Sequence, residues 1–473
     1  SAGSVTVTAA NGITLNGDLS AVGGTHNGAG SGDGNGGDVI FNSAVNLGGD
    51  VDIDTQRGGA LNSPSDGLID FTSTLNGGSA LTANAGDTGA VRFGDLVGNN
   101  APLSSLTVTN ANAVTFSADV TTVGAQNVTA SPIATNGTHS TSSSPISFDG
   151  AVTLQDDTVL DTGAGTGDIT ITGTVDFYQN LTLTAGGGNI DLQNHVGGGT
   201  PLADFTINSA NNVDLARVYA DTITQLAGTG TTTIGDLMIS NVGDISVTTS
   251  SITQDEIIIA SGNVVLDANA FIQLNNGSIT ANRLIHLIAD VSTVQDAASH
   301  GGLQATDLLL EGDGDFTLIT DGATNQVDTL ATVGTVNGQV SFENDQALAI
   351  GSVDDAAANT NNGASAESLL VSTTAGNLTV DQAAEAVPGD LLLHAQSGDL
   401  QINNTVDAIG DTSLLASDAI NQAVTGDITV GGSLDVDAQG GNITMADNGT
   451  DTAFTDVTGN VRYQATGNIL VGT

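Results

Sequence analysis

The feature that most constrains this chain is a three-residue unit that recurs along its length. The unit is a glycine, then aspartate or asparagine, then valine, isoleucine, leucine or phenylalanine. Independent placement of these residue types would give roughly three such units, so their abundance indicates an internal repeat. The glycines of the units are Gly17, Gly37, Gly49, Gly94, Gly167, Gly188, Gly235, Gly243, Gly262, Gly314, Gly376, Gly389, Gly398, Gly426, Gly441, Gly459 and Gly467.

Alternating apolar and polar residues follow most of these units, as in "SGNVVLDANAFIQLNNGSITANR" from Ser261 to Arg283. Alternation with period two is typical of a strand with one buried face. We interpret the glycine as a turn residue with positive φ, and the Asp or Asn as hydrogen-bonding the backbone just beyond it. This stretch is predicted to be one coil of a scaffold. The side chains expected to point inward are Val264, Leu266, Ile272, Leu274 and Ile279.

The spacing of the units indicates how the strands are arranged. Gly235 and Gly243 are 8 residues apart, which fits successive sides of one coil, whereas Gly243 and Gly262 are 19 apart, which fits a full coil. Short strands without helical crossovers favour a parallel β-helix over a sandwich, which would show domain boundaries. The predicted fold is all-β: a parallel β-helix, or β-solenoid, of about 20 coils. It is expected to run through residues 1–473 as a single unit.

Four stretches interrupt the repeat and are predicted to be lateral loop insertions. A loop of this kind leaves the stacked core intact, and binding often concentrates there. The stretches are 23–37, 130–145, 197–202 and 354–366. In addition, "DQAAEAV" (Asp381 to Val387) is predicted to form one helical turn that Pro388 ends.

Composition restricts the partners. The chain has 5 Lys+Arg against 52 Asp+Glu, a formal net charge of -47, and no cysteine. Nucleic acid and anionic lipid bind through basic residues, so neither is an expected partner. Disulfides and thiolate sites are excluded. No apolar run is long enough to insert directly into a membrane.

Several stretches carry a resemblance to a known family. The run from Gly262 to Asp290, with "QATDLLLEGDGDFTL" (Gln304 to Leu318) and "VNGQVSFENDQALAIGSV" (Val336 to Val353), resembles the repeat region of filamentous-haemagglutinin-type adhesins. These are large bacterial exoproteins of the two-partner secretion and autotransporter kind. The resemblance spans nearly the whole chain. It implies a right-handed parallel β-helix, a secreted or cell-surface location, and a non-enzymatic adhesive or structural role in a rod, filament, sheath or surface layer.

The resemblance also frames expectations about partners and about the ends. A secretion-cap signature of the Asn-Pro-Asn-Gly-Ile type and a membrane barrel are not found in the sequence, so the chain is expected to be part of a longer secreted protein or a relative with different export. Both ends lie within the repeat, and an uncapped coil offers unpaired strand edges. Expected partners are cell surfaces, glycans or proteins, or copies of the chain stacked end to end.

A polysaccharide-active β-helix enzyme, a lyase or hydrolase, is the alternative. Gly-His-Gly and Arg-Ile-Lys signatures are absent, and aromatic residues make up 3% of the chain, which leaves few platforms for sugar rings. The histidines are scattered without a metal-binding motif and are interpreted as surface or turn residues. They are His26, His139, His195, His286, His300 and His394. No catalytic residue is predicted.

Two acidic stretches are candidate Ca²⁺ sites. In "DVDID" the carboxylates alternate, so they share one strand face about 7 Å apart, and "EGDGDF" is similar. Ca²⁺ prefers such oxygen ligands, although a solvated acidic face explains the same pattern. The candidate ligands are Asp50, Asp52, Asp54, Glu311, Asp313 and Asp315.

Overall fold

The structure is a computed structural model that describes residues 2–25, 33–59, 64–275, 277–295, 301–319, 325–446 and 455–471. These residues form strands and turns, with no α-helix among them and thus no helix that could span a membrane. The chain divides into two compact units, unit 1 (residues 1–232) and unit 2 (residues 233–473). Both units consist of stacked parallel coils, so the predicted all-β solenoid fold is confirmed, with a number of coils close to the expected one. The right-handed winding and the single continuous unit stay predictions.

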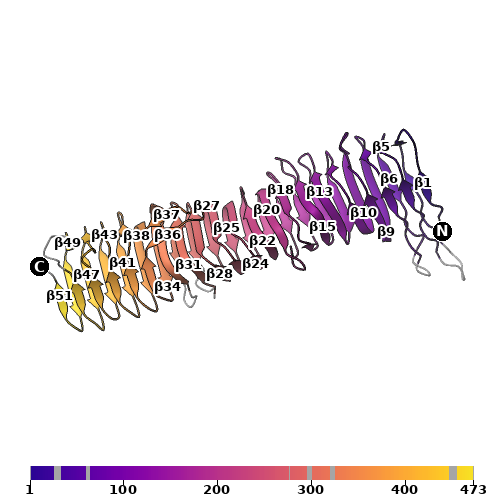
Figure 1. Cartoon of the computed structure of the whole chain (residues 1–473). Helices are drawn as coiled ribbons and strands as arrows, with labels where there is room; N and C mark the ends of the chain where they lie inside the picture. The colour runs from indigo at the N-terminus through magenta and orange to yellow at the C-terminus, as the bar shows by residue number, and fades with distance from the viewer. Residues whose placement is uncertain are drawn as a thin grey trace. The chain divides into compact units, whose positions relative to one another are not determined.

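The strands of unit 1 range from 2 to 14 residues and follow one another in chain order (Figure 1). They are β1 (Val5–Val7), β2 (Ile13–Leu15), β3 (Leu19–Ser20), β4 (Val39–Phe41), β5 (Val45–Leu47), β6 (Val51–Asp54), β7 (Ile69–Phe71), β8 (Leu75–Asn76), β9 (Ala80–Phe93), β10 (Ser105–Phe116), β11 (Val120–Thr121), β12 (Gln126–Ala130), β13 (Ile133–Ser140), β14 (Ile146–Asp149), β15 (Val152–Asp161), β16 (Ile169–Ile171), β17 (Val175–Asp176), β18 (Leu181–Thr184), β19 (Ile190–Leu192), β20 (Leu202–Ser209), β21 (Val213–Leu215) and β22 (Val218–Gln225); β23 (Thr231–Ile234) contains the division point.

The strands of unit 2 range from 3 to 11 residues. They are β24 (Met238–Ser240), β25 (Ile245–Gln254), β26 (Ile258–Ala260), β27 (Val264–Leu274), β28 (Ile279–Ala281), β29 (Leu284–Ala289), β30 (Ser292–Gln295), β31 (Leu303–Glu311), β32 (Asp315–Leu318), β33 (Gln326–Thr332), β34 (Thr335–Asn344), β35 (Leu348–Ile350), β36 (Ser352–Asp354), β37 (Thr360–Asn362), β38 (Ala364–Thr373), β39 (Leu378–Val380), β40 (Ala384–Ala386), β41 (Leu391–Ala395), β42 (Leu400–Ile402), β43 (Val406–Ala408), β44 (Thr412–Ala416), β45 (Ile420–Gln422), β46 (Ile428–Val430), β47 (Leu434–Ala438), β48 (Ile443–Met445), β49 (Thr455–Val457), β50 (Val461–Ala465) and β51 (Ile469–Val471).

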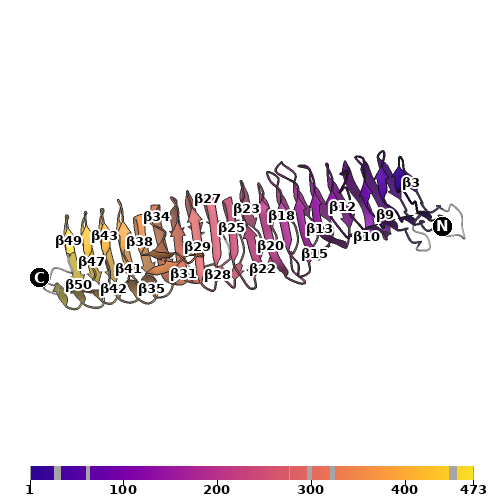
Figure 2. The same cartoon turned by 45° about the horizontal axis from the view of Figure 1, so that its top comes forward.

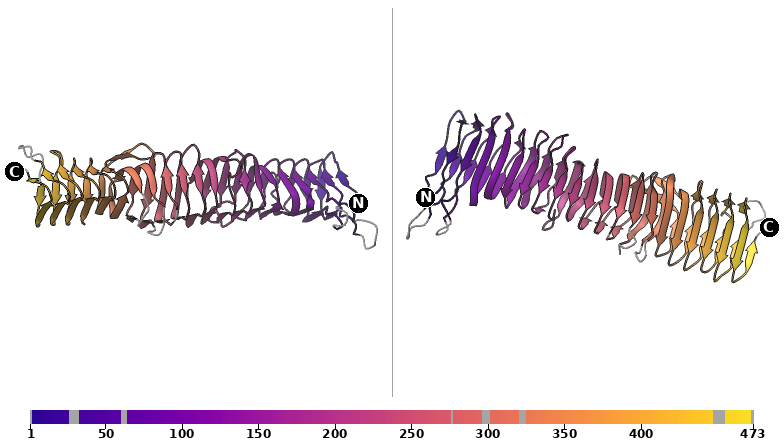
Figure 3. Two further views of the ribbon diagram at one scale, coloured as in Figure 1. Left: turned by 90° about the horizontal axis from the view of Figure 1, so that it is seen from below. Right: turned by 180° about the vertical axis from the view of Figure 1, so that it is seen from behind.

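Parallel ladders connect each coil to the next, and like residues stack along them. In unit 1 one ladder runs from Val39 through Ile69 and Val91 to Val114. A ladder of unit 2 joins β39, β42, β45, β48 and β51 in the same way. Figure 2 and Figure 3 show from other directions that, within each unit, strands one coil apart lie side by side. Each coil therefore covers the apolar side chains of the coil before it.

The interior of each coil is apolar, as the alternation predicts. The five side chains expected to point inward from the stretch that begins at Ser261 are all at most 4% exposed, so this prediction is confirmed. Burying a side chain of this size stabilises the fold by roughly 1.5–3 kcal/mol. The outward positions between them carry polar residues such as Asp267 and Gln273. The stretch therefore forms part of the stacked coils.

The aspartate or asparagine of the repeated unit hydrogen-bonds across coils. In eleven of the units its Oδ1 accepts the backbone N–H of a residue 19 to 34 positions further on, at 2.7 to 3.2 Å. We call each such bond an inter-coil bracket. The predicted bond to the backbone just beyond is formed by Asp95 and Asp236 but is wrong for these eleven. They are Asp18, Asp38, Asp50, Asp168, Asn189, Asp244, Asp315, Asn377, Asp390, Asp399 and Asn442.

At several of the repeated units the glycine permits a close approach between coils. A Cβ on Gly188 would lie 2.1 Å from the carbonyl oxygen of Gly167, and one on Gly262 would lie 2.1 Å from Oδ1 of Asp244. Among the glycines of these units, Gly376 has a positive φ, of 77°, and the others do not. The predicted positive φ is therefore wrong for the rest. At Gly188 and Gly262 the coil spacing, rather than the turn conformation, selects glycine, whereas a Cβ on Gly17 would meet no atom within 4 Å.

Asp411 provides a direct test of the inter-coil bracket. Its Oδ1 accepts the amide of Ser433 at 2.7 Å, and its own amide donates to Oδ1 of Asp390 at 2.8 Å. The Asp411→Ala substitution removes this acceptor and leaves the amide of Ser433 without its partner. We therefore expect the free energy of unfolding to fall by about 1–2 kcal/mol. Asp411→Asn keeps an acceptor oxygen and is expected to retain most of the stability. Urea denaturation followed by circular dichroism measures both variants, and equal losses would contradict the bracket.

A column of phenylalanines runs through the interior of unit 1. Phe41, Phe71, Phe93 and Phe116 stack in consecutive coils, with ring centroids 5.0 to 5.5 Å apart. Each stacked pair contributes roughly 0.5–1.5 kcal/mol beyond its buried area. Sequence reasoning missed the column, although a signal exists: each ring is the third residue of a similar triplet, "VIF", "IDF", "VRF" and "VTF".

The column continues through a buried histidine. His139 is fully buried, and its ring lies edge-on to Phe116 at 4.8 Å and to Phe148 at 5.2 Å. Its Nε2 pairs with Thr135 Oγ1 at 2.7 Å, and its Nδ1 pairs with Gln126 Oε1 at 2.9 Å. Burial lowers the pKa of His139 to about 3, so the ring is neutral at neutral pH. The interpretation of this histidine as a surface residue is wrong.

The prediction of a loop at 130–145 is wrong for residues 133–140. Residues 133–140 form β13, which pairs in parallel with β10 and β15 and belongs to the coil itself. Its interior positions include the polar residues Thr135 and His139, whose mutual hydrogen bond makes their burial possible. Polar residues at interior positions conceal the apolar alternation, so the strand resembles a loop in the sequence.

The other predicted insertions have mixed outcomes. The loop at 23–37 falls partly on residues 26–32, which lie outside the described residues. Residues 197–201 form a turn, and Leu202 opens β20. The predicted helical turn at 381–387 is wrong, because residues 384–386 form β40, paired in parallel with β38 and β43. Pairing with neighbouring coils overrides the local preference of these residues.

The insertion at 354–366 contains an antiparallel hairpin. Strands β36 and β37 pair with each other, and β38 begins at Ala364. Val353 of the hairpin is buried in an apolar cluster with Leu284, Leu309 and Ala331. Arg283 fixes the hairpin from the side: its Nη1 and Nη2 donate to the carbonyl oxygens of Asp354 and Asp355 at 2.8 and 3.0 Å.

Candidate functional site

The first set of predicted Ca²⁺ ligands lies on and beside β6. Asp52 and Asp54 point outward, since Val51 and Ile53 occupy the buried positions of the strand. Asp50 accepts the amide of Ala80 at 2.9 Å, and Asp54 accepts the amide of Gln56 at 3.0 Å. Two of the three carboxylates therefore already hydrogen-bond the backbone.

The second set is also divided among other contacts. Asp315 accepts the amide of Gln339 at 2.8 Å, and Asp313 accepts Nδ2 of Asn337 at 2.5 Å. Glu311 contacts His286 instead. Within the described part of the chain, no group of three His, Asp or Glu side chains is arranged to hold a metal ion. A Ca²⁺ site at either set stays a prediction, and the geometry described here lends it no support.

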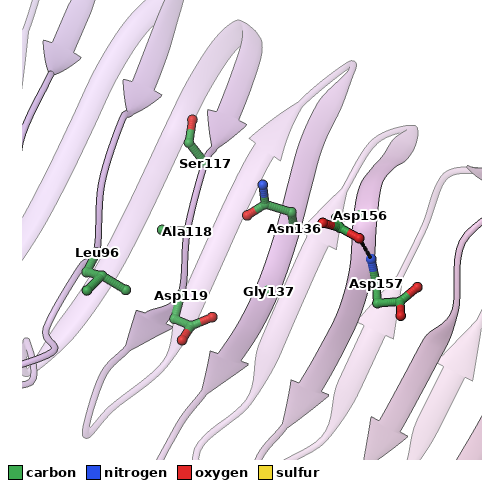
Figure 4. A pocket seen from close by; sticks show the side chains of 8 residues that line it. All are labelled: Leu96, Ser117, Ala118, Asp119, Asn136, Gly137, Asp156 and Asp157. Carbon is green, nitrogen blue, oxygen red and sulfur yellow. Dashed lines mark hydrogen bonds between the residues drawn. The ribbon is translucent and has the colours of Figure 1, made fainter.

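A shallow, open hollow on unit 1 also carries carboxylates (Figure 4). Asp119 accepts the amide of Thr138 at 2.7 Å, and Asp157 accepts the amide of Asn180 at 3.0 Å, so both act as inter-coil brackets. Oδ1 of Asp156 accepts the amide of Asp157, the bond drawn in Figure 4. These carboxylates hold turns in place. The hollow is lined by Leu96, Ser117, Ala118, Asp119, Asn136, Gly137, Asp156 and Asp157.

A cluster of titratable side chains lies on the outer face of β27, β29 and β31. In the parallel register Asp267 and Glu311 lie on either side of Ile288, and His286 precedes Ile288 by two residues. His286 Nε2 lies 3.0 Å from Oε2 of Glu311 but lacks the alignment of a hydrogen bond. The imidazole is 8% exposed and the Glu311 side chain 38%. This cluster is the candidate site for proton-transfer chemistry.

Burial and neighbouring charges shift the proton affinities in this cluster. Burial raises the pKa of Glu311, and the charges of Asp267, Asp355 and Asp290 raise it further. Burial also raises the pKa of Asp267, against a hydrogen bond from Thr248. Burial lowers the pKa of His286 to about 4, although the charge of Asp355 opposes this. Carboxyl groups with raised pKa values beside a neutral imidazole occur in acid–base sites and also in structural networks.

A pair of exposed aromatic rings distinguishes one turn of unit 1. Phe177 and Tyr178 are 55% and 58% exposed and follow β17 directly. Phe177 has a φ of 97°, a region that bulky residues avoid. Tyr178 Oη donates to Oδ2 of Asp221 at 2.5 Å, and this bond and the charge of Asp221 raise the pKa of Tyr178. This turn is the candidate binding surface.

Sequence reasoning did not single out the titratable cluster or the aromatic turn. A signal for each is present. "DLLLE" (Asp307 to Glu311) breaks the alternation with three consecutive leucines, which indicates a strand covered on both faces. "FY" at Phe177 and Tyr178 is a doublet of aromatic residues in a chain with few of them.

Comparison with known protein families, curated proteins and solved structures gave no match.

Proposed function

We propose that the chain is a non-enzymatic structural or adhesive β-solenoid of a secreted or bacterial cell-surface protein, of the filamentous-haemagglutinin type. The observation that carries this proposal is the use of the repeated Asp and Asn residues. These residues supply many of the side-chain hydrogen bonds of the chain, and in both units they hydrogen-bond one coil to the next. Such residues maintain a regular outer surface, which a scaffold or adhesin requires.

The net charge of the chain limits the kinds of partner that this proposed surface can bind. A net charge of -47 creates a negative potential that attracts cations and basic surfaces and repels nucleic acid and anionic lipid. Cell surfaces, glycans, proteins or other copies of the chain remain as partners. Attraction of this kind weakens as salt concentration rises, because the Debye length falls to about 10 Å at 0.1 M.

The titratable cluster supports a second candidate function, a polysaccharide-active β-helix enzyme. Lyases and hydrolases of polysaccharides need a proton acceptor and a proton donor beside the sugar. Glu311 and Asp267, with raised pKa values beside His286, are groups of the necessary type. The hairpin that contains Asp355 is adjacent to them, since its carboxylate influences both His286 and Glu311.

An assay on acidic polysaccharides separates the two functions. The full chain is incubated with polygalacturonate and alginate, and reducing ends and unsaturated uronates are measured over time. We expect no release above the buffer control, because the titratable groups serve the fold. Release that disappears in Glu311→Gln but persists in the nearby control Asp313→Asn would overturn the proposal and establish the enzyme.

A further inference from the structure

The turn at Phe177 departs from the burial that most phenylalanines of the chain show. Of the ten phenylalanines in the described part of the chain, eight are fully buried, whereas Phe177 is 55% exposed. Its backbone also has a φ of 97°, which costs free energy in any residue with a side chain. A glycine would suit this position better for folding alone. The exposed ring therefore calls for an explanation other than stability.

The turn is held rigidly by the coils on both sides. Asp157 accepts both the amide and Nδ2 of Asn180, each at 3.0 Å, and Asn180 Oδ1 accepts the amide of Asp204 at 3.0 Å. Asp176 accepts the amide of Gly199 at 2.6 Å. The amide of Gln179 donates to the carbonyl oxygen of Phe177 at 2.9 Å, which closes a tight turn around Tyr178. The two rings project from a pre-organised backbone.

Tyr178 is also fixed at its far end. Its hydroxyl reaches Asp221, 43 residues further on, across the intervening coil that contains Asp204. Because the hydroxyl is already hydrogen-bonded, the ring face is what the side chain offers to a partner. Holding the ring in place in advance reduces the entropy lost on binding.

Carboxylates lie close to the Tyr178 hydroxyl. Asp221 and Asp204 both lie close enough to Tyr178 to influence its hydroxyl. Asp176 precedes Phe177 in the chain. A cation placed on an aromatic face is attracted by the ring, and nearby carboxylates strengthen that attraction.

We propose that Phe177 and Tyr178 form a docking surface for a cationic side chain, arginine or lysine, presented by a partner protein. This inference rests on the proposed function, because it names the partner chemistry of an adhesive or scaffold surface. The negative charge of the chain brings a basic partner to the surface, and the ring faces with Asp204 and Asp221 hold the cation.

The charge at the site favours a cation over a neutral sugar, because the carboxylates attract positive charge and a sugar carries none. Some of the polar groups that a sugar would need are also already engaged. Here the Tyr178 hydroxyl is bonded to Asp221, Oδ1 of Asp204 accepts the Thr222 hydroxyl, and Oδ1 of Asp176 accepts a backbone amide. A guanidinium or ammonium group needs only a ring face and negative charge nearby.

Nuclear magnetic resonance of the full chain tests the proposal. The sequence has 3 tyrosines, so a ¹³C-tyrosine-labelled sample gives a small set of ring signals that substitution assigns. The probe is a blocked peptide of alternating glycine and arginine. We expect Tyr178 signals to shift on titration while those of Tyr463 do not, and the shift to shrink in high salt. Calorimetry should show that Tyr178→Ala weakens binding about fivefold.

Matched variants control for non-specific attraction to an acidic chain. Phe271→Ala removes another exposed ring, which is 40% exposed, and is expected to leave the affinity unchanged. Phe177→Gly should weaken binding about threefold without lowering the melting temperature, because glycine accepts the positive φ.

Two results would overturn the inference. The first is equal peptide affinity in Tyr178→Ala, Phe271→Ala and the unmodified chain. The second is a Tyr178 shift produced by a neutral oligosaccharide but not by the peptide. Neither result touches the proposed scaffold function, which fails only if the polysaccharide assay detects product release that depends on Glu311.

Discussion

Replacing Gly188 with alanine is expected to lower the free energy of unfolding of unit 1 by about 3 kcal/mol. The new Cβ would lie 2.1 Å from the carbonyl oxygen of Gly167 and 2.5 Å from its carbonyl carbon. Both are backbone atoms, so the clash is relieved only if the two coils separate. Separation stretches the inter-coil bracket from Asp168 to the amide of Asn189, now 2.7 Å long.

Gly17→Ala is the matched control. Gly17 belongs to the same repeated unit in the same part of the chain, but nothing lies within 4 Å of the position its Cβ would take. We expect this variant to be as stable as the unmodified chain or slightly more stable, since alanine restricts the unfolded state. Urea denaturation followed by circular dichroism compares them. Similar midpoints for the two variants would show that coil spacing does not select glycine.

His139→Gln is expected to flatten the pH dependence of stability. The pKa of His139 is about 3 in the folded state, against 6.5 for an ordinary histidine, so between these values the unfolded chain binds the extra proton. Stability from this group is therefore complete above pH 6.5 and falls as pH decreases toward 3, by about 1.4 kcal/mol per pH unit. Between pH 7 and pH 5 the unmodified chain should lose about 2 kcal/mol that the variant retains.

Phe93→Leu serves as the control for this prediction. It weakens the same aromatic column but removes no titratable group, so stability should drop by a similar amount at every pH. Urea midpoints measured from pH 7 to pH 5 give the slopes. His286, with a pKa of about 4, contributes a slope of the same sign in all these proteins. A His139→Gln variant as pH-sensitive as Phe93→Leu would contradict the assignment.

The sequence was sufficient for those strands whose interior positions are apolar. Val264, Leu266 and Ile272 are buried as the alternation predicts, because each strand has one interior face. The reasons for the repeated glycine and aspartate were not accessible in the same way. Both depend on contacts with a residue one coil away, such as the contact of Asp244 with Asn263. The local sequence does not specify how many residues separate two such partners.

Strands with polar interior residues escaped prediction for a related reason. β13 places Thr135 and His139 inside, and only the fold brings Gln126 close enough to satisfy them. Burial of these groups without partners would be costly, so the pattern favours a loop until the partners are known. The phenylalanine column, by contrast, could have been found from triplets repeated at coil spacing.

The candidate sites were the least predictable part. Carboxylates on one strand face, such as Asp52 and Asp54, are visible in the sequence, but their backbone partners are not. The cluster around Glu311 depends on β27, β29 and β31 lying side by side. Tyr178 hydrogen-bonds Asp221, which lies two coils further along the chain. Each site combines residues from different coils, which requires the register.

The eleven inter-coil brackets share one direction along the chain. In each of the eleven brackets the accepting oxygen belongs to the earlier coil and the donating amide to the later one. Asn325 and Asn344 form the opposite arrangement, because they accept the amides of Leu303 and Val327 from the coil before. At the bracketed coils, a chain emerging amino end first would offer the next coil acceptors that are already in place. Any added strand that used these bonds would have to join in a single polarity, so two identical edges could not pair through them.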